Sequence, residues 1–535
     1  MRIVNGGAWW IALVAAWIAL CVPLLLVELP PLNDYPNHLA RMVVLSRIGD
    51  DPVLASMYRT NWGIIPDLAI DSFMPALVKV IPPLVAGKLL LAGILLLDIV
   101  GAAAYAAAVH GRRTWWALGV ALAGYNFAFT MGFLNFDVSI GLAMLMAAGW
   151  IRIRRRNPLR AALFGAVATA ILFFCHLIGL FFFLVLVGSF EAWFTFAMLR
   201  QTGWTKATSW RTLTAAGPLG VTLLPVAALY PLTGLSSTVD APTIFLTAQG
   251  KLAQMVSPFV NYDFTLDALT CCAVWGLLLV CLASRRLALA PGACVAVAVV
   301  AAVFVAAPAE YKGGGFLDAR LSVMLGFLAF TAFRPLLSGR IAVAVGITLA
   351  ALLCVRLATV SVAWLEWRPA VADLRALASL VHPGDRIIQV RIDPGEISDY
   401  WARIPVALRT STHERTEFHM PGYFFIERSA FWPYLFADEL QQPILMRQPY
   451  YDLGYAADDM PTHAELSRRR AAGNPQAANP YCAFDVVVFL DLWAEANPAT
   501  IAPDWLEFVA ANKTAALYRV RAPRTCSPRA HHPQG

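Results

Sequence analysis

The chain has 535 residues, of which 59% are hydrophobic and only 14% are charged, and its mean hydropathy is +0.62. Soluble domains carry about 25% charged residues, so this composition excludes an ordinary soluble enzyme and indicates a polytopic membrane protein. The net charge of +7 comes from short basic clusters between apolar segments, which argues against a nucleic acid as partner.

The first apolar segment, residues 9–27, ends in "VELPPLND" and lacks a small-residue cleavage pattern, so it predicts an uncleaved transmembrane helix. Further segments of similar length follow through the first two thirds of the chain. We expect about eleven α-helical spans, at residues 9–27, 84–109, 115–131, 134–151, 159–175, 177–199, 212–233, 267–284, 288–307, 321–337 and 341–364.

The basic residues predict the orientation of these spans. With eleven spans, every strongly basic short loop falls on the same side as the amino terminus; these loops are 110–114, 152–160, 200–211, 284–286 and 338–340. Because short cytoplasmic loops are enriched in Lys and Arg, we expect a multi-pass protein of the cytoplasmic (inner) membrane with a cytoplasmic amino terminus. The remaining loops and the carboxy-terminal part are then extracytoplasmic.

The composition changes near residue 365. Residues 1–364 predict a transmembrane domain with a first outer loop at 28–83, and residues 365–535 predict an extracytoplasmic soluble domain of α/β or α+β class. Strands are expected within 384–392 and 484–492, and a helix followed by a strand within 499–521. Cys482 and Cys526 lie in this domain and could pair in an oxidising compartment.

The first outer loop contains "PLNDYPNHLAR", residues 31–41, with Asp34, His38 and Arg41 close together. Pro36 suits the first turn of a helix and Asp34 suits its cap, so we expect a short amphipathic helix at the membrane interface, to about residue 48. Residues three or four apart lie on one helix face, so the three polar side chains can point to a common volume. The alternative is that Asp34 only caps the helix and Arg41 only contacts lipid phosphates.

Other predicted outer loops also carry ionisable residues, which are costly at membrane depth and usually mark function. The turn "GFLNFDVS" contains Asp137, "FFCHLIG" contains His176, and "PAEYKGGGFLDARLS" contains four more charged residues, Glu310, Lys312, Asp318 and Arg320. Alone, His176 could be a satisfied core histidine, and Asp318 with Arg320 a simple ion pair. Together they predict a substrate-binding set on one membrane face, namely His38, Arg41, Asp137, His176, Lys312, Asp318 and Arg320.

Four stretches, "NDYPNHLAR", "GFLDARLS", "MGFLNFDVSIGLAML" and "FFCHLIGL", together with the layout of spans, resemble the GT-C superfamily of integral-membrane glycosyltransferases. The resemblance implies an enzyme that moves a hexose or pentose from a polyprenyl-phosphate donor to a glycan, lipid or protein acceptor at the outer face. It implies that Asp34 is the catalytic base or a metal-binding acid, and that Arg320 contacts the lipid phosphate.

The chain departs from the family pattern at one point. Many members pair two acids one residue apart in the first loop, whereas here Leu32 and Pro36 flank Asp34 at that spacing. A Mg²⁺ or Mn²⁺ site would need a second acid from another loop, Asp137 or Asp318. Two alternatives to a transferase also stay open: a transporter or flippase of a lipid-linked precursor, and a non-catalytic scaffold whose outer domain binds an envelope component.

Overall fold

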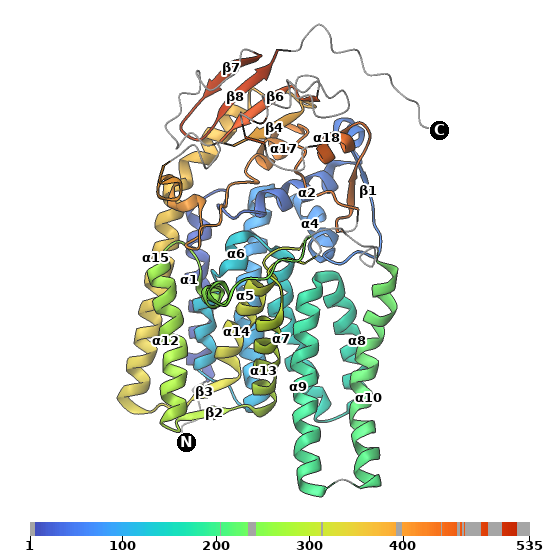
Figure 1. The fold of residues 1–535 in the computed structure, drawn as a ribbon, viewed down its shortest axis with the longest axis vertical. Helices are drawn as coiled ribbons and strands as arrows, with labels where there is room; N and C mark the ends of the chain where they lie inside the picture. The colour runs from blue at the N-terminus through green and yellow to red at the C-terminus, as the bar shows by residue number, and fades with distance from the viewer. Residues whose placement is uncertain are drawn as a thin grey trace.

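The structure is a computed structural model, and it describes residues 6–203, 205–233, 242–311, 314–391, 398–439, 441–456, 461–462, 465, 483–490 and 505–521. Long helices form a bundle, and short helices and a four-stranded sheet cover one end of this bundle (Figure 1). We call this end the sheet end.

Within the residues that the structure describes, seven helices are long and apolar enough to cross a membrane, so the chain is a multi-pass membrane protein. Each coincides with a span expected from the sequence; they are α1 (Gly6–Leu26), α5 (Pro83–His110), α7 (Leu134–Arg154), α8 (Pro158–Cys175), α9 (Leu177–Thr202), α12 (Phe264–Ala283) and α15 (Gly339–Ala378). Three other helices accompany them in the bundle, α10 (Lys206–Leu229), α13 (Pro291–Ala306) and α14 (Leu317–Thr331).

Two expected spans differ from the prediction. Residues 115–131 form a 3₁₀ helix, η1 (Trp116–Ala123), and a separate helix α6 (Phe127–Met131), because the Asn126 side chain accepts from Phe129 N–H and caps a new helix. The span expected at 321–337 is helical only to Thr331. Strand β3 (Phe333–Pro335) then pairs antiparallel with β2 (Leu287–Leu289) at the end of the bundle away from the sheet end.

The first loop supplies several short elements at the sheet end: α2 (Tyr35–Arg47), α3 (Pro52–Met57), strand β1 (Tyr58–Thr60) and α4 (Ala69–Val80). Pro36 lies in the first turn of α2, as expected. Strand β1 pairs antiparallel with β5 (Ile444–Met446), which joins the first loop to the carboxy-terminal part. Between α10 and α12 lie η2 (Tyr230–Leu232), α11 (Ala248–Gln254) and η4 (Ser257–Phe259).

The carboxy-terminal part contains a mixed sheet. Strands β4 (Ile387–Val390), β6 (Val486–Phe489), β8 (Ala516–Val520) and β7 (Leu506–Ala511) follow in that spatial order, with β4 and β6 parallel and the other pairs antiparallel. The prediction of an α-helix within 499–521 is wrong for the residues that the structure describes, because residues 506–511 form β7. Asn512 Oδ1 accepts from Thr514 and Ala515 N–H, and this turn folds β7 and β8 into a hairpin.

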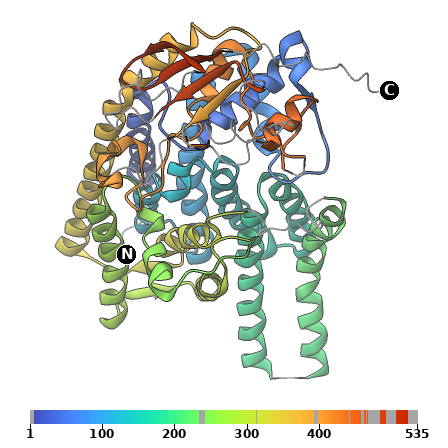
Figure 2. The same cartoon turned by 45° about the horizontal axis from the view of Figure 1, so that its top comes forward.

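The remaining elements of this part are α16 (Tyr400–Arg403), η6 (Val406–Leu408), α17 (Gly422–Arg428) and α18 (Tyr450–Ala456). Helix α17 packs on α2, and most of α2 is buried. The helix expected at the membrane interface is therefore largely covered by protein. Figure 2 shows the sheet near α15, while α9 and α10 extend away from it.

Candidate active site

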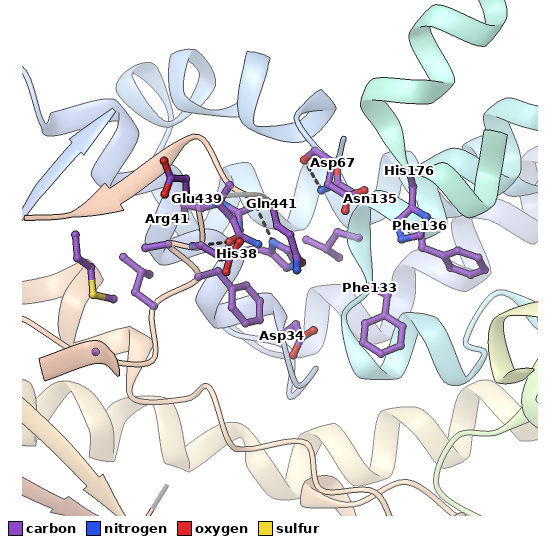
Figure 3. Close-up of a pocket in the computed structure, with 18 of the residues that line it drawn as sticks. Asp34, His38, Arg41, Asp67, Phe133, Asn135, Phe136, His176, Glu439 and Gln441 are labelled. Atoms are coloured by element: carbon purple, nitrogen blue, oxygen red, sulfur yellow. Dashed lines mark hydrogen bonds between the residues drawn. The ribbon is translucent and has the colours of Figure 1, made fainter. Parts of the chain in front are cut away.

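A cavity of about 630 Å³ lies at the sheet end, between the bundle and the segment 433–442. Five places in the described part of the chain bring polar side chains to it: α2, the turn before α4, the starts of α7 and α9, and the start of α14. Most of these side chains are drawn in Figure 3. Its size suits a small-molecule headgroup, for which cavities of about 300–1,000 Å³ are usual. The polar residues that line it from the membrane side are Asp34, His38, Arg41, Asp67, Asn135, His176 and Arg320.

Asp34 is the N-cap residue of α2, but its carboxylate makes no hydrogen bond to the helix. The backbone N–H of Asp34 donates to Met131 O at 3.0 Å, which fixes its position against α6. The Asn33 side chain donates to Asp34 Oδ1 at 3.0 Å. Burial raises the pKa of Asp34 to about 7, although Arg320 and Arg41 act in the opposite direction. The carboxylate is therefore available to the cavity rather than used in capping.

His419, from the carboxy-terminal part, faces Asp34. Its Nε2 atom lies 3.8 Å from Asp34 Oδ1, longer than a hydrogen bond. The Asn37 amide donates to His419 Nδ1 at 2.6 Å and to Tyr434 O at 2.7 Å, and its oxygen accepts from Phe436 N–H at 2.8 Å.

The two main-chain bonds fix which end of the Asn37 amide is the donor, so Nδ1 of His419 accepts and Nε2 carries the proton. Burial lowers the pKa of His419 to about 3, so the ring stays neutral at pH 7. His419 therefore presents an N–H group to Asp34.

His38 and His176 have the same arrangement. Arg41 has no acceptor atom, so its Nη2 donates to His38 Nδ1 at 3.1 Å. The backbone N–H of Ile178 donates to His176 Nδ1 at 3.0 Å. Burial lowers the pKa of His38 well below its usual value, which keeps this ring neutral. Both residues line the cavity, and each leaves Nε2–H as a donor for a bound group.

Arg320, in the first turn of α14, brings positive charge to the cavity. Its guanidinium carbon lies 4.2 Å from the centre of the Phe133 ring and 5.8 Å from that of Phe136. It makes no ion pair with any residue that the structure describes, and its buried Nε has no hydrogen-bond partner there. A guanidinium held on aromatic rings without a carboxylate is a ready contact for a phosphate group.

Arg41 lines the cavity but is largely committed elsewhere. Its Nε and Nη2 donate to the two carboxylate oxygens of Asp71 on α4, each at 2.8 Å, and both side chains are almost fully buried. This bidentate pair joins α2 to α4. Nη1 of Arg41 is buried without a partner among the described residues. Arg41 thus holds the helix that carries Asp34 and His38.

Asp67 lines the cavity too, and the sequence reasoning missed it. Asn135 Nδ2 donates to the backbone oxygen of Asp67 at 2.8 Å, which ties the turn before α4 to the start of α7. Asp67 has φ of 70°, a conformation in which Asp and Asn are several-fold enriched among non-glycine residues. Burial raises its pKa to about 7. The dipeptide Pro66–Asp67 was the available signal, and it indicates only a turn.

Two other predicted residues that the structure describes, Asp137 and Asp318, are not among those that line the cavity. Asp137 is buried one residue beyond Phe136 on α7. Asp318 is 0% exposed and pairs with Lys251 of α11 at 3.2 Å, so it anchors the segment before η4 rather than forming a pair with Arg320. Lys312 falls outside the described residues, as do Cys482 and Cys526.

The outer wall of the cavity also escaped the sequence reasoning. In this outer wall, Phe436 packs edge-on against His38, with ring centres 5.3 Å apart. It also packs against His419 with the rings tilted and their centres 4.9 Å apart. Glu439 and Gln441 extend from this wall into the cavity (Figure 3). The cavity is thus closed by residues about 400 positions away from Asp34 in the chain.

The described residues contain no group of three or more His, Cys, Asp and Glu side chains that could hold a metal ion. The second acids that a two-carboxylate site would need, Asp137 and Asp318, do not line the cavity with Asp34. Asp67 does line the cavity with Asp34, so a Mg²⁺ or Mn²⁺ site that includes Asp34 stays a prediction.

Sequence comparisons find no matching family model and no matching curated protein. The fold, however, is similar to that of two solved structures. One is ArnT from Cupriavidus metallidurans in the apo state, with a TM-score of 0.51, 13% identity, and 96% of this chain and 98% of that chain covered. The other is the same protein bound to undecaprenyl phosphate, with a TM-score of 0.51, 14% identity, and 98% and 100% covered. The chain therefore has a fold similar to that of ArnT, and this likeness agrees with the fold expected from the sequence.

Proposed function

We propose that the chain is a glycosyltransferase that moves a sugar from a polyprenyl-phosphate donor to an envelope or lipid-linked acceptor. The reaction takes place at the outer face of the cytoplasmic membrane, the side on which the positive-inside pattern puts the sheet end. Asp34 acts as the general base, and Arg320 holds the phosphate of the donor.

One observation carries the proposal most directly: the partly buried carboxylate of Asp34 and the guanidinium of Arg320, which has no ion-pair partner among the described residues, line the same cavity. The Asp34 carboxylate is not used in capping, and burial raises its pKa to about 7, near the value that suits a general base at neutral pH. Arg320 makes no ion pair among the described residues, and it acts on Asp34 as a neighbouring positive charge.

In the reaction, the acceptor hydroxyl transfers its proton to Asp34 as its oxygen attacks the anomeric carbon of the donor sugar. The bond between that carbon and the phosphate oxygen breaks, and its electron pair leaves with the phosphate. The products are the glycosylated acceptor, the polyprenyl phosphate and one proton, which Asp34 passes to water. No metal takes part in these steps.

The leaving phosphate gains charge as the bond breaks. The Arg320 guanidinium and the Nε2–H groups of His38 and His176 are hydrogen-bond donors that can stabilise it. The similar fold of ArnT, solved with undecaprenyl phosphate, supports a prenyl phosphate as the donor's lipid part. His419 supplies a further N–H group that orients Asp34 and leaves Oδ2 to take the proton.

The proposal is tested with the purified chain and a panel of polyprenyl-phosphate sugars, with release of polyprenyl phosphate followed by mass spectrometry. Asp34→Asn should lower turnover by about 100-fold or more, because a general base contributes about 10²–10⁴-fold. Its binding of undecaprenyl phosphate should stay within about twofold, since the Arg320 contact is kept. Full turnover by the Asn variant would rule out Asp34 as the base.

A further inference from the structure

A second cavity, of about 450 Å³, lies at the last turn of α2, whereas Asp34 lies at the start of this helix. Its lining residues come from the segment after α1, the start of α5, the last turn of α2, the last turn of α15, and α17. Its walls combine charged and aliphatic residues: Glu28, Arg47, Pro82, Pro83, Leu84, Val85, Lys88, Arg375, Ile426 and Glu427. None of these residues lines the Asp34 cavity.

Two of its three cations have no carboxylate partner among the described residues. Lys88 Nζ donates to the backbone oxygen of Val27 at 3.3 Å, and Arg47 Nη1 donates to that of Ile426 at 3.4 Å. Each keeps further N–H donors for another group.

The third cation, Arg375, is balanced within the protein. It contacts Glu28 Oε2 at 2.7 Å and the Tyr423 hydroxyl at 3.0 Å. Glu427 accepts from the same hydroxyl at 2.8 Å. The two positive charges of Arg47 and Lys88 exceed the negative charge of Glu427 by one, so the cavity has one excess positive charge. The amino terminus of the 28-residue helix α5 adds partial positive charge at its wall.

The depth of the cavity is that of lipid headgroups. Lys88 lies in the second turn of the membrane span α5, and α1 ends at Leu26 on the same side. Apolar side chains next to the cavity are exposed: Leu25 is 76% and Leu89 is 53% exposed. Lysines at the ends of membrane spans commonly extend their ammonium groups to lipid phosphates while their methylenes lie along apolar surface. The half-buried Lys88, beside exposed aliphatic side chains, has this position.

We propose that this cavity binds the phosphate of a membrane lipid headgroup, held by Arg47 and Lys88, with the acyl chains along the exposed side chains of α1 and α5. The bound lipid bridges the bundle and the carboxy-terminal part, because Arg47 and Ile426 belong to α2 and α17 while Lys88 belongs to a span. The site does not depend on the proposed transfer reaction.

The test uses the full chain, delipidated in a neutral detergent, with phosphatidylglycerol added stepwise and bound lipid counted by native mass spectrometry. Lys88→Ala and Arg47→Ala should each weaken binding about fivefold, since a cation near an anionic surface contributes about that much. The matched control is Lys79→Ala, an exposed cation on α4 outside both cavities, which should leave binding unchanged. Lys88→Gln keeps a polar side chain but removes the charge, and it should behave like Lys88→Ala.

Three comparisons decide the source of the phosphate and the place of binding. Inorganic phosphate should bind far more weakly than phosphatidylglycerol; equal affinity would overturn the assignment to a lipid. Asp34→Asn and Arg320→Ala should leave phosphatidylglycerol binding unchanged; a loss there would move the lipid to the Asp34 cavity and refute the second site. Unchanged binding in the folded double variant of Arg47 and Lys88, with melting temperature as the check of folding, would refute it as well.

Discussion

Asn37 Nδ2 lies 2.6 Å from His419 Nδ1, although 382 residues separate the two in the chain. Through this bond, the carboxy-terminal part fixes a neutral imidazole whose N–H faces Asp34. Hydrogen bonds at a catalytic group are often long in the absence of substrate and shorten in the complex. The distance of 3.8 Å between His419 Nε2 and Asp34 Oδ1 fits such a contact.

A pair of variants at His419 tests this role. His419→Phe keeps a ring against Phe436 but removes the N–H group, and should lower kcat about tenfold with little change in KM, because a hydrogen bond to a charged group contributes about 1.5–3 kcal/mol. His419→Gln restores an N–H donor and should recover most of kcat. If both variants lose activity and melting temperature alike, His419 has only a structural role.

The pH dependence of transfer should report the Asp34 carboxyl. Burial raises its pKa to about 7, so the basic form dominates above that pH and is lost below it. We expect kcat/KM to fall about tenfold for each pH unit below 7 and to level off above it. Asp67, whose pKa is also raised to about 7, supplies the control. If Asp67→Asn abolishes this acid limb while keeping activity at high pH, the limb belongs to Asp67 instead.

Arg320 should act on the phosphate. Arg320→Ala should lower kcat/KM by about 10–100-fold, since a charged hydrogen bond to the leaving group is lost, and Arg320→Lys should recover only part because Lys cannot bind bidentately. Arg113 is a matched control, a guanidinium 4.8 Å from the Trp10 ring at the other end of α5. Turnover by Arg320→Ala equal to that of Arg113→Ala would contradict the assignment.

The Arg41–Asp71 pair should contribute to stability. Arg41→Met leaves the Asp71 carboxylate buried without its partner, which should cost about 3–5 kcal/mol and lower the melting temperature. Glu28→Gln removes one partner of the exposed Arg375–Glu28 pair and should cost about 1 kcal/mol or less. Equal melting temperatures for the two variants would show that the buried pair does not hold α2 to α4.

Chelation tests the lone-base mechanism. Treatment with EDTA should leave transfer within about twofold of the untreated rate, since no step depends on a bound cation. A larger loss that added Mg²⁺ or Mn²⁺ restores would favour the alternative in which Asp34 is a metal ligand.

Hydropathy predicted the spans because a helix that crosses a bilayer must be apolar over about 20 residues, whatever its neighbours. The same topology places Asp34, His38, Arg41, His176 and Arg320 on one face, and the structure brings them to one cavity. Asp137 and Asp318 failed to join them, because a side chain one position along a helix points in another direction. Their direction depends on packing that hydropathy does not report.

Contacts between distant segments were beyond the sequence reasoning. His419 and the segment 433–442 reach Asp34 only because the carboxy-terminal part docks on α2. The final strand was predicted, but the β7 segment was mistaken for a helix because "LEFVAANKTAALYRV" is rich in Ala and Leu, whose helix propensity is high. The turn at Asn512 and the pairing of β8 with β6 stabilise both segments as strands.

A structure of the chain with undecaprenyl phosphate tests the central claim most directly. The account predicts the phosphate in the 630 Å³ cavity, with an oxygen about 3 Å from the Arg320 guanidinium and the prenyl tail leading into the bilayer. A phosphate bound outside this cavity, at Lys88 or elsewhere, with Arg320 still lying free on Phe133, would contradict it.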